Sequence, residues 1–70
     1  MFIGSITMND IVTNIANNPK RADKIRKAPG HIRGETIQRY ITAECAAHKV
    51  KFSEEDNMEC YRKILRFLSI

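Results

Sequence analysis

The strongest local pattern in the chain begins residues 53–70, SEEDNMECYRKILRFLSI. Ser53 is a strong candidate for a helix N-cap, and the three acidic residues that follow it favour the positive end of a helix dipole. Beyond them, apolar side chains recur every three or four residues, as on one face of a helix. They are Met58, Tyr61, Ile64, Leu65 and Leu68, with Cys60 and Phe67 at the edge of that face. The pattern predicts an amphipathic helix over 54–69 that packs its apolar side on other helices.

The segment before it predicts a second long helix, over 35–50. Its apolar residues spread over more than half of the helix circumference, which is typical of a central helix with several neighbours. Small side chains at Ala43, Ala46 and Ala47 would let such neighbours come close. Pro29-Gly30 predicts the end of the preceding helix, and 31–34 is expected to be a loop.

The N-terminal half predicts two shorter helices, over 8–16 and 19–28. Thr7 and Asp10 form a pattern similar to a capping box, and Asn18 followed by Pro19 is a typical helix start after the Asn-Asn-Pro break. The first three residues either remain loose or pack Phe2 and Ile3 onto the bundle. The fold class expected is all-α, a small compact bundle of four helices (about 8–16, 19–28, 35–50 and 54–69) in a single helical domain, 1–70.

Composition narrows the class of protein. Seventy residues allow one small core, and 43% apolar with 29% charged residues is typical of a folded domain. No stretch approaches the roughly 18 apolar residues of a membrane span, and the N-terminus does not resemble a signal peptide. Two cysteines make no disulfide framework, so reduced thiols and a cytoplasmic location are expected. We expect no membrane, metal or cofactor.

Positive charge is concentrated in one segment. Of the net charge of +4, residues 20–33 carry six basic side chains against Asp23 alone. A helix, a tight turn and a basic helix also resemble the outline of a helix-turn-helix, in which the start of the second helix meets the nucleic acid. The sequence therefore favours a non-enzymatic regulatory protein that binds DNA or RNA. The residues expected to bind are Lys20, Arg21, Lys24, Arg26, Lys27 and Arg33.

The alternative is a protein-binding adaptor or inhibitor that docks the same basic residues on an acidic surface of a larger complex, because charge alone does not separate an acidic protein from phosphates. The last helix carries more apolar surface than three short helices are expected to cover. Tyr61, Phe67 and Ile70 are therefore possible protein contacts, and a homodimer is possible.

Three weaker patterns are better explained by ordinary packing than by a functional site. Gln38 and Arg39 have the side chains of base readers, but their helix looks too apolar to lie outside the bundle. Glu44 and His48 are four residues apart and predict a hydrogen bond at the rim of the core rather than a general base. Cys45, Cys60, His31 and His48 match no standard zinc spacing. The chain is accordingly predicted not to be an enzyme.

Overall fold

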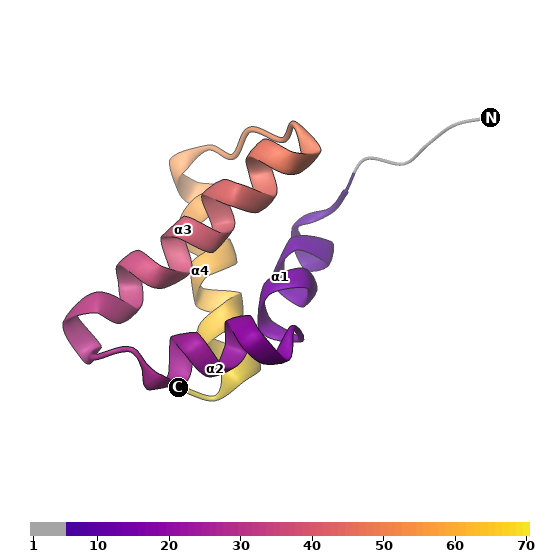
Figure 1. Ribbon diagram of the computed structural model, residues 1–70. Coiled ribbons are helices and arrows are strands. Elements are labelled where there is room, and N and C mark those ends of the chain that lie inside the picture. The colour runs from indigo at the N-terminus through magenta and orange to yellow at the C-terminus, as the bar shows by residue number, and fades with distance from the viewer. Residues whose placement is uncertain (1–5) are drawn as a thin grey trace.

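Four helices and no strand make up residues 6–70, the part of the chain described by the computed structural model (Figure 1). They are α1 (Met8–Ala16), α2 (Pro19–Lys27), α3 (Gly30–His48) and α4 (Glu54–Leu68). Helix α4 packs against both α1 and α3, and α2 crosses the end of the bundle at which α4 finishes. The predicted all-α bundle is confirmed. The alternatives for Phe2 and Ile3 lie outside the described residues.

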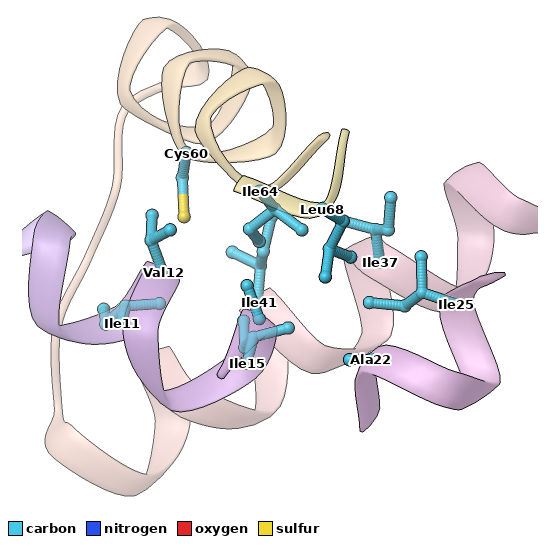
Figure 2. Packing of buried hydrophobic residues seen from close by; sticks show 11 residues of the cluster. Ile11, Val12, Ile15, Ala22, Ile25, Ile37, Ile41, Cys60, Ile64 and Leu68 are labelled. Atoms are coloured by element: carbon cyan, nitrogen blue, oxygen red, sulfur yellow. The ribbon is translucent and has the colours of Figure 1, made fainter. Parts of the chain in front are cut away.

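Six fully buried isoleucines, contributed by all four helices, form the centre of the core (Figure 2). Burying an isoleucine side chain contributes about 1.5–3 kcal/mol, so this set is the main source of stability in so short a chain. The cluster also includes Leu68 and four smaller side chains, those of Val12, Ala16, Ala22 and Cys60. The six residues are Ile11, Ile15, Ile25, Ile37, Ile41 and Ile64.

The predicted helix starts are confirmed for three of the helices. Thr7 and Asp10 form a capping box at α1, with both reciprocal hydrogen bonds present. The Asn18 side chain accepts from the first free N–H groups of α2, and Pro19 occupies the first turn. Ser53 accepts from the backbone of Asp56 at α4. These caps satisfy backbone donors that would otherwise lack partners.

The loop predicted for 31–34 is wrong, because α3 already begins at Gly30. Only Ala28 and Pro29 separate α2 from α3, and the carbonyl of Pro29 accepts the first hydrogen bonds of the helix from Ile32 and Arg33, at 2.8 and 2.9 Å. Proline fixes its own φ and disfavours a helical residue before it, so the pair ends one helix and starts the next. Both ends of α1 and the starts of α2 and α4 match the prediction, and the C-terminal ends of α2, α3 and α4 come one or two residues early.

The wide apolar arc predicted for α3 is only partly buried. The buried residues of α3 are Ile37, Ile41 and Glu44, whereas its alanines at 43, 46 and 47 are exposed. On α4, Met58 is half exposed, although the pattern placed it on the buried face, and Cys60 is fully buried. With only four short helices, the bundle covers one narrow stripe of α3 rather than half of it.

Gly34 on α3 faces the end of the Tyr61 side chain on α4. A Cβ atom added at this position would lie 3.0 Å from the hydroxyl oxygen of Tyr61, closer than ordinary van der Waals contact. The next nearest atom, Cζ of the same ring, is 3.9 Å away. The glycine thus accommodates one particular atom of the facing helix.

Gly34→Ala is therefore expected to gain little stability, although alanine in a helix interior is normally favoured over glycine by about 1 kcal/mol. In a Tyr61→Phe background, which removes the obstructing oxygen, the same substitution should recover that gain. Chemical denaturation of the four proteins in this double-mutant cycle measures the coupling. Equal effects of Gly34→Ala in both backgrounds would contradict the close contact.

Candidate anion-binding groove

Helix α2 has one face turned into the bundle and one turned to solvent. Ala22 and Ile25 are buried against the core. The six basic residues predicted to bind a partner do not share a face with one another, because this short helix and its flanks wrap around the end of the bundle. The structure divides them into three arginines that bond to the protein itself and three lysines that line one groove.

Arg21 is held by an acidic residue of α3. Its Nη1 atom donates to Oε2 of Glu44 at 2.8 Å, and its guanidinium lies 5.2 Å from the ring centroid of Tyr40. The pair is largely buried, with the side chains 28% and 11% exposed. Arg21 is thus already neutralised, so the prediction that it meets a nucleic acid first loses its support.

Arg26 and Arg33 donate to carbonyl groups at the ends of helices. Nη2 of Arg26 donates to the carbonyl of Leu68 at 3.3 Å. Arg33 donates to the carbonyls of Ile25 and Arg26, at 3.2 and 3.3 Å. The last carbonyls of a helix lack partners within the helix and carry its negative dipole end, so these arginines stabilise the termini of α4 and α2.

The three lysines follow one stripe along α2. Lys20, Lys24 and Lys27 are spaced four and three residues apart, which places them on one exposed face. Lys27 pairs with Asp23 at 3.2 Å, but both side chains are mostly exposed, so the pair contributes little. No carboxylate among residues 6–70 lies within ion-pair distance of Lys20 or Lys24. Their ammonium groups are available to a ligand.

These lysines border an open groove of about 550 Å³ between α2 and the first turns of α3. We call it the lysine groove. Its remaining surface is mainly apolar and includes Ala28, Pro29 and Ile32, whose side chain is 39% exposed. A basic rim with an apolar floor suits a ligand that carries negative charge beside an apolar group.

Glu44 sits at the rim of the core and is surrounded by donors. It accepts from Arg21 and from the amide of Asn14, at 2.8 and 3.0 Å, and the His48 ring lies 3.4 Å away. Burial raises the pKa of Glu44. The hydrogen bonds from Arg21 and Asn14 and the nearby positive charges lower it, and together they outweigh burial, so the pKa is below its ordinary value. His48 is within ion-pair distance of Glu44 but makes no hydrogen bond to it, so the predicted Glu44–His48 hydrogen bond is not found. The carboxylate is instead engaged by Arg21 and Asn14, which makes it a poor base.

The thiols are unpaired and poorly ionised. Burial, with a smaller contribution from Cys45, raises the pKa of Cys60 to about 11, and burial likewise raises the pKa of Cys45. Residues 6–70 contain no group of three or more His, Cys, Asp or Glu side chains placed to hold a metal ion.

The three possible protein contacts differ in exposure. Phe67 and Ile70 are 50% and 42% exposed, whereas Tyr61 is partly buried over Gly34. Phe67 lies beside Val12 in a shallow hollow between α4 and α1. Substituting Tyr61 would disturb the fold as well as a contact, so Phe67 is the cleaner probe of this surface.

The two candidate base readers of α3 also differ. Gln38 exchanges two side-chain hydrogen bonds with Asn57 of α4, at 2.9 and 2.7 Å, while Arg39 is exposed. The residue that the sequence did not single out is Ile32, because it fell in a predicted loop. The signal that could have found it is its spacing of four residues before Thr36, which lines the same groove.

Within the described residues, no helix has the length and apolar character needed to cross a bilayer. Comparison with known protein families, curated proteins and solved structures finds no match to this chain.

Proposed function

We propose that this chain is a non-enzymatic, cytoplasmic binding protein, an adaptor or inhibitor that docks its lysine groove on an acidic segment of a partner protein. The observation that carries the proposal is the combination of three lysines with the exposed, apolar Ile32 in one groove. Lysine ammonium groups attract carboxylates, and an apolar floor adds a contact that a purely ionic partner would leave unused. The two unpaired, poorly ionised thiols are in keeping with a reducing compartment.

Nucleic acid is the second candidate, supported by the net charge of +4 and by the straight stripe of lysines on one helix. Nucleic-acid binding has less support than the net charge of residues 20–33 alone suggests. Arginine is the usual residue for bidentate contacts to phosphates and guanine, and the three arginines of this segment are bonded within the protein. Three lysines beside Asp23 leave a small net charge for holding a duplex.

Fluorescence anisotropy with three labelled probes distinguishes the candidates. The probes are a 12-residue Asp/Glu-rich peptide with one central phenylalanine, the same peptide with serine at that position, and a random DNA duplex. The phenylalanine peptide should bind at least tenfold more tightly than the serine peptide, since burying an aromatic side chain contributes about 1.5–3 kcal/mol. Ile32→Ser should remove most of that difference.

Lys20→Glu combined with Lys24→Glu should weaken binding of the phenylalanine peptide by more than tenfold. The matched control is Lys49→Glu with Lys51→Glu, which changes the net charge equally at exposed positions in the α3–α4 connection. An equal loss of peptide affinity in both double variants would mean that binding depends only on the net charge of the protein. Tight, log-linearly salt-dependent binding to the duplex, unaffected by Ile32→Ser, would replace the proposal with the nucleic-acid candidate.

A further inference from the structure

The first two turns of α4 have a charge and an exposed apolar residue that complement the lysine groove. Four carboxylates fall within six residues, and all are exposed. Met58 projects among them with half of its side chain in solvent, in a hollow that Glu54, Glu55, Glu59 and Arg62 also line. Capping and the helix dipole account for the acidic residues, but they do not account for an exposed methionine. We call this surface the acidic end; its carboxylates are those of Glu54, Glu55, Asp56 and Glu59.

The acidic end cannot reach the lysine groove of its own chain. The far end of α4 contacts α2 through the hydrogen bond from Arg26 to Leu68. Met58 lies ten residues before Leu68, and a helix rises about 1.5 Å per residue, which places it roughly 15 Å away along the helix. Figure 1 shows the start of α4 beside the α3–α4 connection, at the opposite end of the bundle from α2. Any contact between the two surfaces must therefore join two molecules.

We propose that the lysine groove of one copy binds the acidic end of a second copy, with Met58 seated against Ile32. The two surfaces have opposite charge, and each includes one exposed large hydrophobic residue, Ile32 in the groove and Met58 in the acidic end. Methionine is flexible and polarisable, and it adapts to irregular apolar surfaces such as this groove. The inference rests on the proposed function of the groove as a site for acidic segments with an apolar anchor.

The contact is head-to-tail, so it leaves one free groove and one free acidic end on every pair. Such heterologous contacts close into rings or continue as open chains, depending on the rotation between copies. One helix end in one groove is a small interface, and interfaces below about 1,000 Å² are typically weak and transient. Self-association should therefore appear at high protein concentration and low salt, and it should compete with acidic peptides for the groove.

Sedimentation velocity on the wild type and two charge-reversed proteins tests the arrangement. Lys24→Glu disables the groove, and Glu55→Lys disables the acidic end, so each protein alone should remain monomeric where the wild type associates. Mixed together, they retain one intact groove and one intact acidic end, and should form a one-to-one dimer of twice 8.1 kDa and nothing larger. Arg39→Glu, at an exposed position that lines neither surface, is the control and should associate like the wild type.

The outcomes separate this inference from the proposed function. Glu55→Lys should still bind the phenylalanine peptide, because its groove is unchanged. If it does so while the wild type stays monomeric at millimolar concentration in low salt, the head-to-tail contact is wrong and the proposed function stands. If the wild type associates but the mixed variants do not pair, the contact uses other surfaces and the inference is overturned.

Discussion

Ile41→Asp is expected to abolish cooperative folding. Ile41 is 1% exposed and lies at the centre of the isoleucine cluster (Figure 2). A carboxylate placed there would be buried without a partner, at a cost of several kcal/mol. A domain of this length has a total stability of roughly 4–10 kcal/mol, so little or none would remain. Circular dichroism during thermal unfolding should show loss of the helical signal and of the sharp transition.

Ala43→Asp is the matched control, two residues further along the same helix. The sequence pattern placed both positions in one apolar arc, but Ala43 is exposed. Its substitution should cost only the difference in helix propensity, about 0.7 kcal/mol at most. If both proteins unfold, or if neither does, the narrow buried stripe of α3 is wrong.

Glu44→Ala should be the most destabilising change of a charged residue. It leaves Arg21 without its ion pair and removes an acceptor from Asn14, in a part of the bundle where Glu44 itself is only 11% exposed. Removing one partner from a buried ion pair costs about 3–5 kcal/mol, and the partial exposure of Arg21 lowers the expected loss to about 2 kcal/mol. Asp23→Ala, which breaks the exposed pair with Lys27, should cost less than about 0.5 kcal/mol.

The same carboxylate predicts a pH dependence. Its pKa is lower in the folded protein than in the unfolded chain, so its ionised form stabilises the fold above the unfolded pKa, near 4.5. That contribution is lost as pH falls through this value toward the folded pKa. Urea denaturation at pH 7 and at acidic pH should show a smaller acid-induced loss in Glu44→Gln than in the wild type. An equal loss in both would mean that other carboxylates dominate.

The helix starts were predictable from sequence because they depend on local chemistry. Thr7, Asn18 and Ser53 bond to backbone groups two or three residues away, so the relevant partners lie within one short stretch. The start of α3 was missed because Pro29-Gly30 predicts a helix end followed by a loop over 31–34, a segment that includes Gly34. Its actual role depends on Tyr61, which is 27 residues away in the chain and lies on another helix.

The different surroundings of the six basic residues could not be predicted, for a similar reason. Charge clustering drew attention to α2, but it could not separate its lysines from the arginines. That separation depends on Glu44 and on helix-end carbonyls, whose positions only the tertiary structure gives. The exposure of Phe67 was predicted because the last helix carries more apolar residues than three short helices can cover. The exposure of Met58 was not predicted, because the helical pattern placed it on the buried face.

In residues 20–33 the guanidinium groups hold helices together, whereas the ammonium groups face solvent. This division affects which positions of the sequence can change without loss of the fold. If the lysine groove binds a partner as proposed, exchanges of Lys20 and Lys24 change recognition at little cost in stability, because these side chains bond to no other described part of the protein. Arg21 and Arg33 lack that freedom, since their planar donor groups hold α3 and the end of α2 in place. Under the proposed function, partner preference and architecture are thus encoded by separate positions within fourteen consecutive residues, 20–33.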